Sequence, residues 1–138
     1  MPAGALVGIG FVAAVDEIIF HQLLGWHHFY DKSTPFIGLV SDGILHSAEL
    51  LCLAAGFVAL LNLQRRGALN KMPAVSGFFL GMGGFQLFDG IINHKLLRIH
   101  QIRYGVDILP YDIIWNIFAL ILLAIGFFLF RLQQKRSR

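Results

Sequence analysis

The sequence predicts an all-α fold, an integral membrane four-helix bundle made of two parallel two-helix repeats. Three observations lead to this prediction. Apolar residues make up 57% of the 138 residues and charged residues only 14%, which is unusual for a soluble globular protein. Four apolar stretches are each long enough to cross a hydrocarbon core of about 30 Å, which takes about 20 helical residues. The first stretch also resembles the third when the chain is shifted by 73 residues.

The four predicted spans cover most of the chain and lie roughly at residues 4–26, 36–63, 74–97 and 111–130. No basic segment precedes the first span and no small-residue cleavage site follows it, so we expect a mature helix rather than a signal peptide. The length suits one domain, and we therefore predict a single four-helix transmembrane domain over residues 1–138. The single cysteine, Cys52, excludes an intrachain disulfide and a cysteine-rich metal site.

Basic residues flank the spans unevenly. The strongest clusters are QRRGALNK, which starts at Gln64 after the second span, and RLQQKRSR, which starts at Arg131 after the fourth. The positive-inside rule then places both termini and the middle loop in the cytoplasm. These flanks account for the formal charge of +3, and they favour binding to anionic lipid over binding to nucleic acid.

Two segments of similar sequence indicate an internal repeat. DEIIFHQLLGWH begins at Asp16, and DGIINHKLLRIH begins at Asp89. The shift of 73 residues aligns one aspartate and two histidines of the two segments. Because each repeat holds two spans, both halves enter the membrane from the same side, as in parallel repeats. We therefore divide the chain into repeat one, residues 1–66, and repeat two, residues 67–138.

Every predicted helix carries ionisable or amide side chains within its apolar sequence. Such groups are costly in hydrocarbon and usually belong to a site. At about 100° per residue, Asp16 and His27 share one face of the first helix, and the polar residues of the other helices also share faces. Facing imidazoles and carboxylates are the usual transition-metal ligands of helical bundles, so we predict a metal site near the outer face. The predicted ligands are His21, His46, His94, Glu17, Asp42, Glu49, Asp89 and Asp16.

A second set of residues is predicted to support these ligands. The set consists of His27, His28, His100, Asp112 and Asn116. Its three histidines fall near predicted helix ends, where amphipathic rings often settle at the membrane interface. The aspartates of both sets can serve either as ligands or as acceptors that fix the histidine tautomers.

Three segments resemble a bacterial family of short membrane proteins of unknown function. They are DEIIFHQLLGWHH from Asp16, SDGILHSAE from Ser41 and FDGIINHKLLRIHQIR from Phe88. The resemblance covers nearly the whole chain. It implies a location in the bacterial inner membrane and a connection with the assembly of cytochrome oxidase copper centres, which ranks copper ahead of zinc and iron.

The favoured function is the binding of one or two transition-metal ions by an integral membrane protein, for metal delivery or respiratory oxidase assembly. The polar segments lack the sulfur ligands that Cu(I) prefers, so Cu(II), zinc or iron fits better. Two alternatives stay open, a metal- or haem-dependent membrane oxidoreductase and a proton-linked or structural subunit of a membrane complex. Haem is the less favoured cofactor because carboxylates surround the histidines. The expected partners are the lipid bilayer and either further copies of the chain or respiratory assembly proteins, with no nucleic acid.

Overall fold

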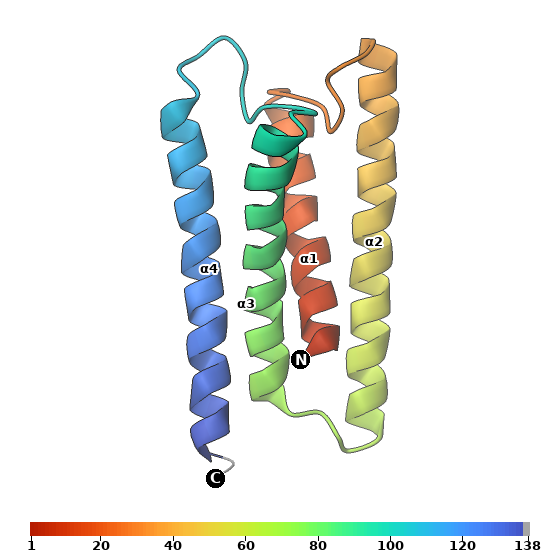
Figure 1. Ribbon diagram of the computed structural model, residues 1–138. Coiled ribbons are helices and arrows are strands. Elements are labelled where there is room, and N and C mark those ends of the chain that lie inside the picture. Colours follow the sequence, from red (N-terminus) through yellow and green to blue (C-terminus); the bar gives the residue numbers. More distant parts are fainter. Residues whose placement is uncertain (137–138) are drawn as a thin grey trace.

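The computed structural model describes residues 1–136, which form four long helices and contain no strand (Figure 1). The bounds are α1 Pro2–Asp16, α2 Pro35–Arg65, α3 Lys71–Phe88 and α4 Leu109–Arg136. Two short π-helices, η1 (Glu17–Leu23) and η2 (Asp89–Leu96), continue α1 and α3. Together these segments make four helical units that are long and apolar enough to cross a membrane. The predicted all-α membrane fold is confirmed, and each predicted span overlaps one of these units.

The local sequence explains where helices α2 and α3 begin. The Thr34 side chain accepts a hydrogen bond from the backbone N–H of Ile37 at the start of α2. The Asn70 side chain accepts one from the N–H of Met72 at the start of α3. Both residue types are preferred at this position because they satisfy a backbone donor that the helix itself leaves free. Gly67, with φ of 65°, provides the left-handed conformation that ends α2.

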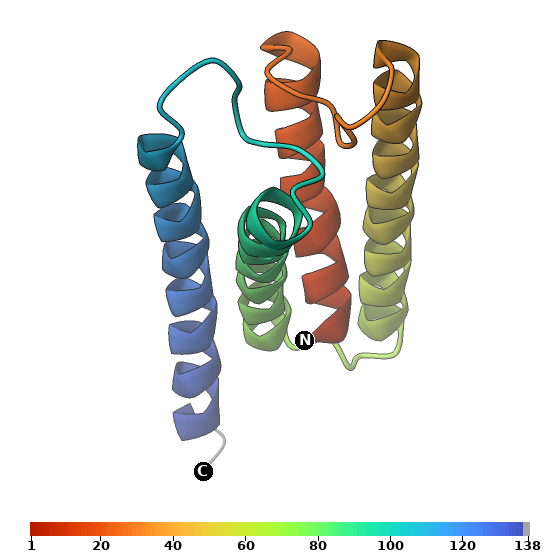
Figure 2. The same cartoon turned by 45° about the horizontal axis from the view of Figure 1, so that its top comes forward.

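The helices form a row with α1 and α3 in the middle (Figures 1 and 2). Helix α2 packs against α1, and α4 packs against α3. Within the membrane-spanning windows, 50% of the first and 44% of the third helical unit is buried, against 11% of α2 and 22% of α4. The N-terminus, the end of α4 and the α2–α3 connection lie at one end of the row, and the other two loops lie at the opposite end (Figure 1). The outer helices therefore provide most of the lipid-facing surface.

The two inner helices run in the same direction and meet through glycines. A Cβ atom added to Gly4 would lie 2.0 Å from the carbonyl oxygen of Ala74, and one added to Gly81 would lie 2.2 Å from the carbonyl oxygen of Ala5. Small residues four positions apart allow such backbone contact between membrane helices. This contact fixes the spacing of α1 and α3 toward the end that carries the N-terminus.

A small apolar core occupies the level between the glycine contact and the π-helices. Val12, Met82 and Leu122 are its buried members, and three phenylalanines of α3 pack around them. These side chains offer no hydrogen-bonding path along the helices. The buried ionisable residues lie on the other side of this core, toward the end that carries the π-helices.

Candidate metal centre

The two π-helices place each histidine beside the aspartate that precedes it. In an α-helix, a residue five positions further on is rotated by about 140°, whereas the i→i+5 bonding of a π-helix brings it close to the same face. Asp16 and His21 have this spacing, and so do Asp89 and His94. The Nε2 of His94 lies 2.9 Å from Asp89 Oδ2, and the Nε2 of His21 lies 3.8 Å from Asp16 Oδ2.

After each π-helix, the chain turns back into the row of helices. Gly25 and Arg98 make the turns in the left-handed conformation, with φ of 56° and 52°. His27 and His100 follow these turns and are only 5% and 1% exposed. The prediction that Asp16 and His27 share one face of a continuous helix is wrong, because a left-handed residue ends a helix and redirects the chain. His28 likewise lies in the loop after the turn.

Two clusters of converging ligand atoms result from this arrangement. In each cluster, one carboxylate oxygen and two imidazole nitrogens lie within 4.8 Å of one another, and all three residues are buried. Corresponding members of the two clusters are 73 positions apart in the sequence. Triad one consists of Asp16, His21 and His27, and triad two consists of Asp89, His94 and His100.

Backbone carbonyls hold the outer nitrogen of the two loop histidines. The Nδ1 of His27 lies 2.8 Å from the carbonyl oxygen of Ile102, and the Nδ1 of His100 lies 2.8 Å from that of Phe29. A ring that donates from Nδ1 presents the lone pair of Nε2 to its surroundings, which is the tautomer that metal ligation requires. Each triad is therefore oriented by the backbone of the other half of the chain.

The loop histidines are also kept uncharged. Burial, followed by the nearby His21 and His100, lowers the pKa of His27 from its ordinary value to about 2. Burial likewise lowers the pKa of His100, although Asp89 opposes this effect. Both rings are neutral at pH 7, and a neutral imidazole is the form that binds a metal.

Several ligand atoms of triad one lack a hydrogen-bond partner in the described part of the chain. They are Asp16 Oδ1, His21 Nε2 and His27 Nε2. In triad two, the Nε2 atoms of His94 and His100 face each other at 2.9 Å. Buried polar atoms without partners are costly, and each is expected to have a role. Two imidazoles and one carboxylate are a donor set that suits a transition metal, so the residues present fit such an ion.

Carboxylates beside α2 hold the other nitrogen of His21. Its Nδ1 lies 2.8 Å from Glu17 Oε2 and 3.0 Å from Asp42 Oδ1. Asp42 also accepts hydrogen bonds from His28 Nδ1 at 2.6 Å and from the N–H of Phe29 at 2.7 Å. The three residues Glu17, His21 and Asp42 form a third cluster with ligand atoms within 4.8 Å. Because Asp42 already has these donors, we interpret Glu17 and Asp42 as residues that orient His21 toward triad one.

Five of the sequence-predicted residues lie outside the three clusters found within residues 1–136, namely His28, His46, Glu49, Asp112 and Asn116. His46 pairs with the buried Glu49 on α2, and the His46 ring is half exposed. Asp112 pairs with Lys95, and the Asn116 side chain donates to the carbonyl of Asp112 on its own helix. The structure thus brings eight of the thirteen predicted residues into the three clusters, and His28 contacts one of these clusters through Asp42.

Sequence reasoning missed several groups that contact the residues of the three clusters. Asn93 donates to Asp89 Oδ1 at 2.8 Å, and Gln22 donates to Glu17 Oε1 at 2.7 Å. Their amides, four and five residues after a carboxylate inside apolar sequence, were a usable signal. The carbonyls of Phe29 and Ile102 had no such signal, because every residue carries a carbonyl.

The fold and the triads define the class: a four-helix membrane protein with two buried histidine–aspartate clusters at one end of its inner helices. The chain matches the family described as Predicted membrane protein (DUF2243) over residues 3–133, and it belongs to that family. The match confirms the resemblance to a membrane protein family of unknown function. No curated protein and no solved structure matches the chain.

Proposed function

We propose that this protein binds two transition-metal ions, one in each triad. The observation that carries the proposal is the convergence of two imidazoles and one carboxylate within 4.8 Å, twice, at buried positions. The hydrogen bonds that the Nδ1 atoms of His27 and His100 donate to backbone carbonyls support it, because they direct Nε2 toward the triads. The burial of one aspartate and two histidines together is costly at membrane depth, and a bound ion would offset this cost.

The donor atoms of the triads narrow the choice of metal. Two histidines with one carboxylate and open positions are typical of non-haem Fe(II), and they also suit zinc and Cu(II). The triads contain no sulfur, which disfavours Cu(I). A metal bound there would supply Lewis acidity or redox chemistry, while the protein provides a dry site and fixed ligands.

Three protein ligands leave room for a ligand from another molecule. This arrangement favours an ion that is passed on, so we propose metal delivery or assembly of a respiratory metal centre, in the bacterial inner membrane. Arg65, Arg66 and Lys71 lie at the end of the row opposite the triads. By the positive-inside rule, that end with both termini is cytoplasmic and the triads lie near the outer face.

Duplication of one two-helix unit would explain the structural features that occur twice in the chain. The left-handed turns at Gly25 and Arg98, the ring–carbonyl bonds of His27 and His100, and the two triads all recur at a spacing of 73 residues. We propose that residues 1–66 and 67–138 are copies of one two-helix unit.

An oxidoreductase is the second candidate. It is favoured by one observation, that Asp16 of triad one also lines an apolar cavity large enough for a small molecule. Reduction of the bound metal by a membrane-soluble donor, followed optically, would support it. A metal that keeps one oxidation state throughout would exclude it.

Metal analysis tests the main proposal. The protein is purified in mild detergent without chelators, supplied with Fe(II), zinc or Cu(II) in turn, desalted and analysed by mass spectrometry. We expect about two ions per chain for one of these metals, about one after His27→Ala or His100→Ala, and an unchanged content after His46→Gln. A wild-type protein that takes up none of the three metals, or equal losses in all three variants, would refute the proposal.

A further inference from the structure

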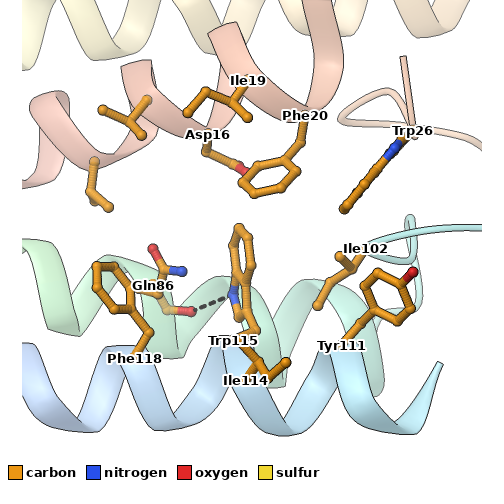
Figure 3. A pocket seen from close by; sticks show the side chains of 12 residues that line it. Asp16, Ile19, Phe20, Trp26, Gln86, Ile102, Tyr111, Ile114, Trp115 and Phe118 are labelled. Carbon is orange, nitrogen blue, oxygen red and sulfur yellow. Dashed lines mark hydrogen bonds between the residues drawn. The ribbon is translucent and has the colours of Figure 1, made fainter. Parts of the chain in front are cut away.

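A cavity of about 450 Å³ lies between α1 and α4 and reaches α3 (Figure 3). Its volume is within the range of small-molecule sites. Asp16 and Gln86 lie at its inner wall, and nearly all other lining residues are aliphatic or aromatic. Ile19 on η1 and Ile114 on α4 border it and are exposed. Because exposed apolar residues of a membrane helix face lipid, the cavity opens toward the bilayer.

The cavity has the length of a lipid chain in one leaflet. Along α1 and η1 it is lined from Val12 to Phe20, a distance of about 12 Å at 1.5 Å per residue. One leaflet contributes about half of the 30 Å hydrocarbon core. An extended acyl chain that lies parallel to α1 and α4 would therefore fill the cavity without crossing the membrane midplane.

The arginine side chain of Arg103 lies at the end of the cavity that faces the loops. The guanidinium carbon of Arg103 is 4.8 Å from the centre of the Trp26 ring and 5.8 Å from that of Tyr111, and its Nη1 donates to the Tyr111 hydroxyl at 2.8 Å. Both rings line the cavity. Arg103 forms no salt bridge with any residue in the described part of the chain. Aromatic rings with an arginine at the end of a span mark the level of lipid headgroups.

We propose that this cavity binds one acyl chain of an anionic phospholipid whose phosphate pairs with Arg103. The apolar walls hold the chain, and the unpaired guanidinium selects a headgroup without its own cation. The bound chain lies against Asp16 of triad one and separates this carboxylate from the bilayer. The lipid site shares only Asp16 with triad one, and the apolar walls and Arg103 that would bind the lipid do not depend on the proposed metal.

The two tryptophans of the chain provide the reporter, since Trp26 and Trp115 both line the cavity. The full-length protein is reconstituted in phosphatidylcholine vesicles that contain about one tenth of either dibromo-phosphatidylglycerol or dibromo-phosphatidylcholine. Bromine on an acyl chain quenches tryptophan fluorescence on contact. We expect the anionic lipid to bind about fivefold more tightly than the zwitterionic one, as one arginine contact at a membrane surface predicts.

Two variants test the two parts of the site, each with a matched control. Arg103→Gln should abolish the preference for the anionic lipid, whereas Arg131→Gln should keep it, because Arg131 also stacks on an aromatic ring of α4 but lies outside the cavity. Val15→Phe fills the cavity and should lower quenching by both lipids, whereas the lipid-facing Ile121→Phe should not. Equal quenching of wild type by both lipids, or a preference that survives Arg103→Gln, overturns the proposal.

Metal content is measured on the same samples. It should be unchanged in Arg103→Gln and Val15→Phe, since neither residue belongs to a triad. Metal-free wild-type protein that still prefers the anionic lipid would refute the metal proposal alone. Metal-loaded protein without that preference would refute the lipid site alone.

Discussion

Replacement of Gly81 by alanine should destabilise the contact between α1 and α3. The new Cβ atom would lie 2.2 Å from the carbonyl oxygen of Ala5, whereas ordinary Cβ contacts begin at 3.4 Å. The obstacle is backbone on a neighbouring helix, so it cannot be relieved by a side-chain rotation. The helices must move apart by about 1 Å, and overpacking of this kind costs about 1–3 kcal/mol.

Gly84 offers the matched control on the same helix. A Cβ atom at Gly84 would meet no atom within 4 Å, so Gly84→Ala should stabilise α3 by up to about 1 kcal/mol through its higher helix propensity. Thermal unfolding of both variants in the same detergent, followed by circular dichroism, compares them directly. If Gly81→Ala melts at or above the temperature of Gly84→Ala, the inferred backbone contact between α1 and α3 is wrong.

Three further predictions concern the site and its orientation. Glu17→Gln should lower the affinity of triad one for metal by about 10–100-fold, because Glu17 orients His21, while the number of bound ions stays the same. Competition with a coloured chelator measures this affinity, and loss of the ion itself would make Glu17 a ligand. Arg98→Gly should raise the free energy of unfolding by about 1 kcal/mol, since glycine adopts the positive φ of this turn without strain, and an unchanged melting temperature would contradict that reasoning. The orientation can be tested with single cysteines introduced into a chain that carries Cys52→Ser. Ser33→Cys should react with an impermeant maleimide in intact cells, whereas Ala68→Cys should react only after lysis. The reverse pattern would invert the proposed orientation.

The sequence was sufficient to predict the four membrane spans, because the length of an apolar run is a local property. It also identified Asp16, His21, Asp89 and His94 as site candidates, since polar groups are rare in such runs. It could not predict how each pair meets. A rotation of 100° per residue separates residues five positions apart, and the π-helical bonding that brings them together depends on packing between the inner helices.

The positions of His27 and His100 were harder to predict than those of the other triad residues. Gly25, two residues before His27, is a typical signal for the end of a helix. Arg98 adopts the same left-handed conformation before His100, but an arginine does not indicate such a turn. For His46, the predicted pairing is present, but the predicted place in the site is not. Its spacing to Glu49 indicates a pair, and the pair exists, but α2 contacts only one side of α1 and the ring stays half exposed.

The exchange of ring–carbonyl bonds between the halves also sets an order of events during biosynthesis. His27 receives its orienting carbonyl from Ile102, which is synthesised 75 residues later. A nascent chain that has inserted only its first two helices therefore presents an unfixed imidazole, whatever metal the compartment contains. Under the proposed function, selective metal loading of triad one would wait until the third helix and the loop after it have left the ribosome, and it would take place only on a chain whose insertion is nearly complete.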